Sequence, residues 1–121
     1  MRRVALLLVA VGLAVPMGWA AGQETEAPAG ALLIILDASG SMNTVDEDGV
    51  PFFEKAKEAV LRLVDALPED MAVGLRVYGH REPNTDPVRG CLDTELVVPV
   101  GPLDREAIRA AVDGLAASGF T

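Results

Sequence analysis

A continuous apolar run that ends on an acid constrains the fold of this chain more than any other feature. Residues 32–36 read LLIIL without any alternation of apolar and polar side chains, and Asp37 follows directly. A continuous run of this length indicates a strand buried on both faces, as in a parallel sheet covered by helices. We therefore expect a buried strand that presents an acid at one edge of a sheet.

The first 20 residues have the layout of a secretory signal. Two arginines precede an apolar stretch at residues 4–15, and small residues stand one and three positions before a cleavage site after Ala20. The stretch is too short to cross a bilayer comfortably, which takes about 20 residues. We expect residues 1–20 to be removed, residues 21–30 to form a flexible leader, and the mature chain to be secreted or periplasmic without a membrane span. The alternative is an uncleaved anchor helix.

The net charge limits the kinds of partner. The chain has 10 basic and 18 acidic residues, a net charge of −8. The expected signal carries two of the bases and no acid, so its removal leaves 8 against 18, or −10. This balance argues against nucleic acid binding, because no basic surface would neutralise phosphates.

Periodicity predicts four further elements. We expect a helix over residues 52–67, a strand over 71–79, a third strand over 94–98 and a helix over 105–116. Proline ends the first of these helices and the third strand, and Asp104 can cap the last helix. A strand, a helix and a strand with these loop lengths form a right-handed crossover, so the first two strands should be parallel. Residues 80–92 are expected to be a loop.

The turn after the first strand has the chemistry of a cation site. Asp37, Ser39 and Ser41 supply one carboxylate and two hydroxyls at alternate positions. Oxygen ligands select hard cations such as Mg²⁺, and a cation held mainly by neutral hydroxyls favours an acidic group from a partner as its last ligand. The alternative is a turn whose side chains bond their own backbone. The position favours a site, because open α/β sheets bind ligands beyond the carboxyl ends of their strands.

The run LLIILDASGSM resembles the start of a von Willebrand factor type A domain, whose metal-ion-dependent adhesion site has the pattern Asp-x-Ser-x-Ser. The likeness extends over residues 31–121 and implies a doubly wound, Rossmann-like α/β sheet with helices on both faces. It implies that Asp37, Ser39, Ser41 and Thr121 bind Mg²⁺ or Mn²⁺, with Ca²⁺ less favoured. It also implies a protein partner that offers a carboxylate to the ion.

We expect the chain to be the N-terminal portion of a longer domain, with the C-terminal part missing. Three strands leave one flank of the first strand unpaired, and exported proteins rarely tolerate such an edge. The family has a further aspartate ligand after a later strand, which is expected beyond residue 121. Cys91 is the only cysteine, and an odd thiol in an exported protein suggests a partner. That partner is another chain or a cysteine beyond residue 121.

These features predict an exported, non-enzymatic binding module, and two alternatives stay open. One is a metal-assisted phosphohydrolase with Asp37 as nucleophile, although Ser39 stands where such enzymes carry a second acid that protonates the leaving group. The other is a structural domain with an inactive site. Because His80 is the only histidine and Cys91 the only cysteine, no His-Cys zinc set can be assembled within this chain.

The remaining polar residues have simpler interpretations. The acidic stretch at residues 46–49 fails the register of a calcium loop, because Lys55 stands where a bidentate Glu is needed. It is expected to be a solvated loop. Three loop side chains are expected at the surface: His80, Arg81 and Arg89. Arg76 lies on the second strand and needs a carboxylate partner if both faces of that strand are covered.

Overall fold

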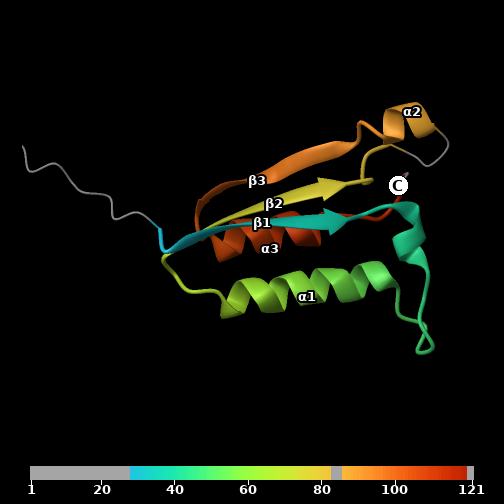
Figure 1. Ribbon diagram of the computed structural model, residues 1–121. Coiled ribbons are helices and arrows are strands. Elements are labelled where there is room, and N and C mark those ends of the chain that lie inside the picture. The colour runs from blue at the N-terminus through green and yellow to red at the C-terminus, as the bar shows by residue number, and fades with distance from the viewer. Residues whose placement is uncertain (1–27, 83–85, 120–121) are drawn as a thin grey trace, which may run out of the picture.

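The computed structural model describes residues 28–82 and 86–119. The expected signal (residues 1–20), most of the expected leader and Thr121 lie outside the described residues. The elements follow in the order β1 (Gly30–Asp37), η1 (Gly40–Asn43), α1 (Phe52–Ala66), β2 (Met71–Tyr78), α2 (Pro87–Gly90), β3 (Thr94–Pro102) and α3 (Arg105–Asp113). They form a small α/β unit in which α1 and α3 lie together on one side of the sheet (Figure 1).

The sheet has the strand order β1-β2-β3. The parallel pairing of β1 with β2, from Gly30–Met71 to Asp37–Tyr78, confirms the predicted crossover. β3 pairs antiparallel with β2 and is longer than predicted, because it continues past Pro99. Proline is compatible with an outer strand, where one row of backbone groups is not needed for pairing, and the register of β3 is irregular in this part.

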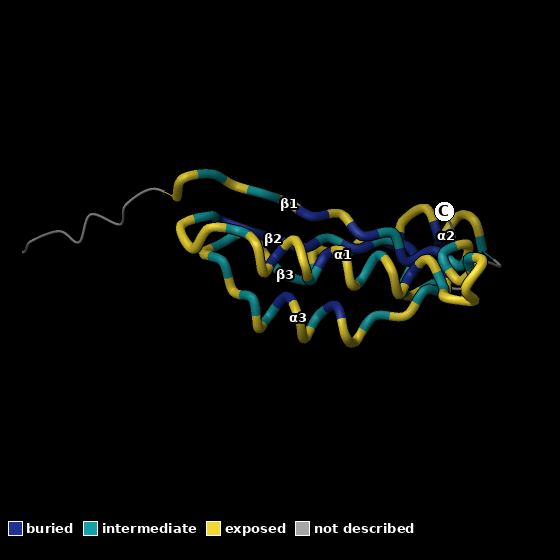
Figure 2. The backbone as a smooth tube through the Cα atoms, turned by 90° about the horizontal axis from the view of Figure 1, so that it is seen from below, coloured by how far each residue is buried: buried dark blue, intermediate teal, exposed yellow. Residues whose placement is uncertain are grey.

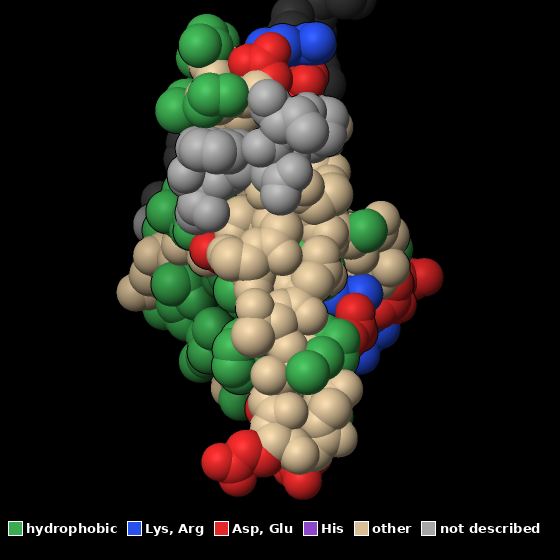
Figure 3. Space-filling model, turned by 90° about the vertical axis from the view of Figure 1, so that its right-hand side faces the viewer, with side chains coloured by type: hydrophobic (Ala, Val, Ile, Leu, Met, Phe, Trp, Pro, Cys, Tyr) green, Lys and Arg blue, Asp and Glu red, His purple; other side chains and the backbone are tan. Residues whose placement is uncertain are grey.

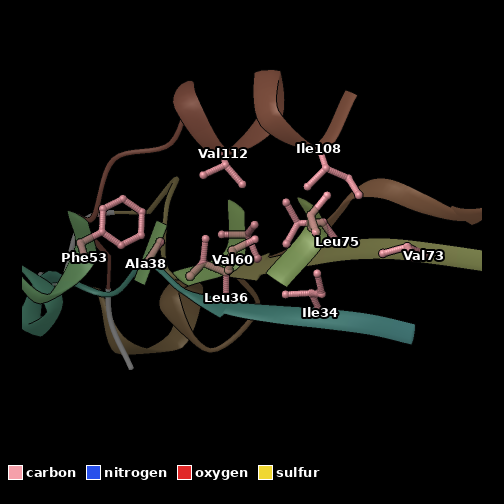
Figure 4. Packing of buried hydrophobic residues seen from close by; sticks show 11 residues of the cluster. Ile34, Leu36, Ala38, Phe53, Val60, Val73, Leu75, Ile108 and Val112 are labelled. Atoms are coloured by element: carbon pink, nitrogen blue, oxygen red, sulfur yellow. The ribbon is translucent and has the colours of Figure 1, made fainter. Parts of the chain in front are cut away.

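One hydrophobic core lies between the sheet and the two long helices (Figure 4). Its buried members come from both layers and are Ile34, Leu36, Ala38, Phe53, Val60, Val64, Val73, Leu75, Val77, Ile108 and Val112. Each long helix turns one stripe of buried residues to the sheet and exposes the rest (Figure 2). The predicted helices 52–67 and 105–116 are confirmed, each ending slightly earlier than predicted.

Only one face of the sheet is covered within the described residues. Ile34 and Leu36 point to the helices (Figure 4), whereas Leu33 and Ile35 on the opposite face are 41% and 61% exposed. The expectation of an α/β sheet is confirmed. The prediction that β1 is buried on both faces is wrong for this part of the chain, because no described element packs against its second face.

Side chains form hydrogen bonds with backbone groups at the start of α3 and at the end of α1. Asp104 caps α3 as predicted, since its Oδ1 accepts the N–H of Ala107 at 2.9 Å. Arg105 then reaches the end of α1, where its Nε and Nη2 donate to the carbonyl oxygens of Val64 (3.2 Å) and Leu67 (2.6 Å). The last carbonyls of a helix have no partner within the helix. Arg105 therefore provides hydrogen-bond donors for two of these carbonyls and links α3 to the end of α1.

Replacement of Arg105 by alanine should destabilise the fold by about 1–3 kcal/mol, because part-buried helix-end carbonyls lose charged donors. Arg62→Ala is the matched control, since Arg62 is exposed and pairs only with Glu58 on its own helix; it should cost less than about 0.5 kcal/mol. Urea unfolding followed by circular dichroism measures both. Equal losses in the two variants would contradict the role of Arg105.

Candidate functional site

The turn that was predicted to bind a cation lies where β1 and β2 end. Asp37 is the last residue of β1 and is paired with Tyr78 at the end of β2. Ser39 follows, and Ser41 lies within η1. This end of the molecule is at the right of Figure 1, and the end-on view in Figure 3 shows mostly backbone and neutral polar side chains there. The predicted placement of the turn at the carboxyl edge of a parallel strand pair is confirmed.

The two serine hydroxyls converge. The Oγ atoms of Ser39 and Ser41 are 3.0 Å apart. Adjacent ligands of an octahedral Mg²⁺ at 2.0–2.1 Å from the ion lie about 2.9 Å apart, whereas Ca²⁺ at 2.3–2.6 Å needs about 3.3–3.7 Å. In this structure the two hydroxyls form a hydrogen bond with each other, and its length is close to one edge of a magnesium octahedron. Ser39 is fully buried and Ser41 is exposed, so the pair extends from the interior to the surface.

Asp37 makes a hydrogen bond that is also expected for the alternative interpretation, a turn whose side chains bond their own backbone. Its Oδ1 accepts the N–H of Ser39 at 2.8 Å. An ionised carboxylate has about four acceptor positions, so this bond fixes the side chain and leaves acceptor capacity for an ion. Burial, a hydrogen bond to Asp37 and the negative charge of Asp37 together raise the pKa of Tyr78 above its ordinary value of 10.0.

The oxygen donors fit a hard cation. The described residues contain no group of three or more His, Cys, Asp or Glu side chains that could hold a metal ion. A site at Asp37 would consequently rely on hydroxyls and on one charge from the chain, which suits Mg²⁺ or Mn²⁺ and disfavours Zn²⁺. Thr121, the fourth predicted ligand, lies outside the described residues.

The segment after α3 is hydrogen-bonded to this turn. The N–H of Gly40 donates to the carbonyl oxygen of Gly119 at 2.7 Å, and the N–H of Ser118 donates to Ala38 at 3.0 Å. In addition, the side-chain amide of Asn43 donates to the carbonyl oxygen of Ala117 at 2.8 Å. The chain is therefore held beside the turn just before Thr121. The role of Asn43 could not be predicted from local sequence, because its partner is a backbone carbonyl distant in the chain.

Two glycines allow this arrangement. The N–H of Gly119 donates to the carbonyl oxygen of Gly79 at 2.7 Å. A Cβ atom on Gly119 would lie 2.5 Å from that same oxygen, closer than such atoms can approach. Gly79 itself has a φ of 70°, in the region that only glycine adopts readily. Neither position tolerates a side chain without displacement of the backbone.

The loop after β2 carries a buried acid that sequence analysis overlooked. Asp93 is 3% exposed and accepts hydrogen bonds from the N–H groups of Arg81 (2.7 Å) and Glu82 (2.9 Å). The Nε of Arg81 donates to its other oxygen at 2.9 Å. Burial alone would raise the pKa of Asp93, but these donors prevail and lower it from 3.8 to about 2. Asp93 thus fixes the loop at the candidate site.

The prediction that His80 is a surface residue is wrong. Its side chain is only 10% exposed and lies between Asp93 and Glu95, with Nε2 3.1 Å from a Glu95 oxygen. The expectation of a surface position is confirmed for Arg81 and Arg89, whose side chains are 49% and 67% exposed. The two acids that surround His80 come from β3 and the residue before it, far along the chain, so the local sequence gives no signal of its burial.

The acidic stretch at residues 46–49 is an ordered turn. Asp46 Oδ1 accepts the N–H groups of Asp48 and Val50, both at 2.9 Å, and Asp46 also forms an ion pair with Lys55. Gly49 completes the turn with a φ of 79°. The carboxylate of Asp46 is thus bound by backbone N–H groups and by Lys55. The structure agrees with the interpretation of this stretch as a turn and not as a calcium-binding loop.

The known proteins that this chain resembles are described as uncharacterised. No family model matches the chain. An uncharacterised protein of Bacillus subtilis (strain 168), YwmC, is 39% identical over 83 residues, which cover 66% of this chain and 36% of YwmC. A crystal structure described as an uncharacterised membrane spanning protein from Vibrio fischeri matches with a TM-score of 0.51 and 22% identity, over 70% of this chain and 37% of that one. The latter likeness shows the fold alone, and the chain spans little more than a third of either protein.

Among residues 28–82 and 86–119, no helix has the length and apolar content needed to cross a bilayer.

Replacement of Gly119 by alanine should weaken the attachment of the C-terminal segment, at a cost of about 1–3 kcal/mol, because the new Cβ overlaps Gly79. Gly114→Ala is the matched control, since its Cβ would meet nothing closer than 3.6 Å. Hydrogen exchange of the Gly40 amide, measured by NMR, should accelerate in Gly119→Ala only. Unchanged protection of this amide would refute the steric argument.

Stability should fall between about pH 4 and pH 2 through Asp93. A carboxyl group whose pKa is lower in the folded state stabilises the fold above its unfolded pKa, and that stabilisation is lost as the pH falls through the folded value. The shift from 3.8 to about 2 corresponds to about 2 kcal/mol. Urea unfolding of the chain and of Asp93→Asn should give a stability difference that shrinks across this range. With Asp65→Asn, an exposed control, the difference should stay small throughout; a constant difference for Asp93→Asn would contradict the assignment.

Proposed function

We propose that this chain carries a cation-dependent binding site for proteins and performs no bond-breaking chemistry. Asp37, Ser39, Ser41 and Thr121 hold Mg²⁺ or Mn²⁺ in this proposal, with Ca²⁺ less favoured. A carboxylate from a protein partner completes the coordination of the ion. The observation that supports the proposal best is the 3.0 Å separation of the Ser39 and Ser41 hydroxyls at the carboxyl edge of the sheet.

Charge at the site supports an acidic ligand. A divalent ion held by neutral hydroxyls and few carboxylates keeps excess positive charge, and hard cations take oxygen ligands to complete six positions. Waters can fill some of these positions, but a carboxylate also neutralises the ion. The exposure of Ser41 leaves an approach open from solvent. The site would therefore recognise an Asp or Glu side chain, or a chain terminus, on the partner.

The proposed module has the doubly wound fold of von Willebrand factor type A domains, with helices on both faces of the sheet. The three described strands and the two long helices on one face are compatible with the first part of that fold. YwmC extends well beyond the aligned region, so a relative of this chain has length for further strands.

We also propose export to the periplasm or the exterior, and pairing of the exposed Cys91 thiol with a cysteine beyond residue 121.

Isothermal titration with MgCl₂ tests the proposal, on a full-length version that includes the C-terminal part of the domain expected beyond residue 121. Asp37→Ala should abolish detectable binding, because the only charged ligand among the described residues is removed. Ser41→Ala should weaken binding by at least about tenfold, since even residues that only orient metal ligands contribute 10–100-fold. Asp48→Ala is the control for the change in net charge, because Asp48 is exposed and lies in the separate acidic turn; it should bind Mg²⁺ normally.

Three outcomes would reject the proposed function. Binding of Mg²⁺ that survives in Asp37→Ala would place the ion elsewhere. Absence of binding when the C-terminal part expected beyond residue 121 is present would favour a structural domain with an inactive site. Turnover of p-nitrophenyl phosphate that Asp37→Asn eliminates would instead identify a phosphohydrolase.

A further inference from the structure

The short helix that carries Ser41 is held at both ends by one distant segment of the chain. At the start of η1, the N–H of Gly40 donates to the carbonyl oxygen of Gly119 at 2.7 Å. At its end, the side-chain amide of Asn43 donates to the carbonyl oxygen of Ala117 at 2.8 Å. Figure 1 shows the segment after α3 returning to this turn. Ser41 therefore lies between two attachments to the same segment.

Few other contacts fix the position of η1. None of its residues is buried, and only Met42 packs partly against the core. A 3₁₀ helix of this length has weak hydrogen-bond geometry of its own. The Oγ atom of Ser41 also shares a hydrogen bond with Ser39, but both hydroxyls would turn to the ion in the proposed site. The place of Ser41 in a loaded site thus depends largely on the two attachments and on Met42.

Only one of the two attachments comes from a side chain. The bond from Gly40 uses a backbone N–H, which nearly every residue type would supply. The bond from Asn43 needs an amide donor, which neither alanine nor an ionised aspartate supplies. Asn43 and Ala117 are 74 positions apart, so their bond connects elements that are not neighbours in the chain. A single side chain therefore determines whether the end of η1 is attached.

We propose that Asn43 is a positioning residue of the cation site, which holds the Ser41 hydroxyl in place by attaching η1 to the segment after α3. The inference rests on the proposed function, because Ser41 is a metal ligand only in that proposal. Asp37 ends a strand of the sheet and Ser39 is fully buried, whereas Ser41 is exposed. Ligands must be held within about 0.5 Å of the geometry that the ion requires. Loss of the Asn43 attachment should therefore weaken binding of the ion.

A carboxylate at position 43 distinguishes positioning from direct coordination. If Asn43 were itself a ligand, an aspartate in its place should bind the ion more tightly, because hard cations favour carboxylates. If Asn43 positions Ser41, the aspartate should fail, because it would place an acceptor against the carbonyl oxygen of Ala117 and leave both without a donor. The two roles predict opposite changes in affinity.

Isothermal titration with MgCl₂, on the full-length version that tests the proposed function, measures the role of Asn43. Asn43→Ala should weaken Mg²⁺ binding about tenfold, at the lower end of the range for residues that orient metal ligands. Asn43→Asp should weaken binding as well, although it adds a negative charge. Thr44→Ala is the matched control, because Thr44 is an exposed neighbour directly after η1; its affinity for Mg²⁺ should be unchanged.

Combination with Ser41→Ala tests whether Asn43 acts through Ser41. Residues that act as one unit have non-additive effects, so Asn43→Ala should have little further effect in a protein that already carries Ser41→Ala. Hydrogen exchange of the Gly40 amide without Mg²⁺ gives a second readout. It should accelerate in Asn43→Ala and not in Thr44→Ala, because the remaining attachment of η1 opens more easily. Circular dichroism establishes that the variants remain folded.

Three results would overturn the inference and leave the proposed function intact. Unchanged Mg²⁺ affinity in Asn43→Ala would remove its role, and tighter binding in Asn43→Asp would identify residue 43 as a ligand. Equal losses from Asn43→Ala with and without Ser41→Ala would show that it acts independently of Ser41. Failure of the unaltered protein to bind Mg²⁺ is a different result, since it would reject the proposed function and the inference with it.

Discussion

A ladder of backbone hydrogen bonds across the tips of the strands is the constraint on which the candidate site depends. The N–H of Gly40 donates to Gly119, that of Gly119 to Gly79, and that of Gly79 to Asp93. Four segments distant in the sequence are thereby joined side by side at one edge. Three of its four members are glycines, and the close approach of Gly119 to Gly79 leaves no space for a Cβ atom on Gly119. Two further hydrogen bonds, from Ser118 to Ala38 and from Asn43 to Ala117, reinforce the attachment of the segment after α3 to the serine turn.

The core and the ladder support each other through β1. Ile34 and Leu36 fix one face of this strand on the helices, which sets the position at which Asp37 leaves the sheet. Arg105 fastens α3 to the end of α1, and α3 in turn delivers the chain to Gly119. The geometry of the site therefore depends on the contact between Arg105 and the end of α1, which contains none of the site's own residues.

Sequence patterns captured the local elements and missed what depends on contacts between distant segments. The apolar stripes predicted both long helices, and the run before Asp37 predicted β1 and the edge at which its turn lies. The exposure of Ile35 could not be predicted, because a continuous apolar run does not show which faces receive a partner. The low exposure of His80 could not be predicted either, because Asp93 and Glu95, which cover its side chain, are brought to it only by the fold. The convergence of Ser39 and Ser41 was a hypothesis from spacing, and only coordinates give the 3.0 Å separation.

The charge of the chain bears on how the proposed cation site would select a partner. The excess of acid repels negatively charged partners at long range. A bound divalent ion at the turn after β1 would supply local positive charge, and a carboxylate would be attracted there against that background. Such an arrangement favours specific docking over general adhesion of acidic proteins.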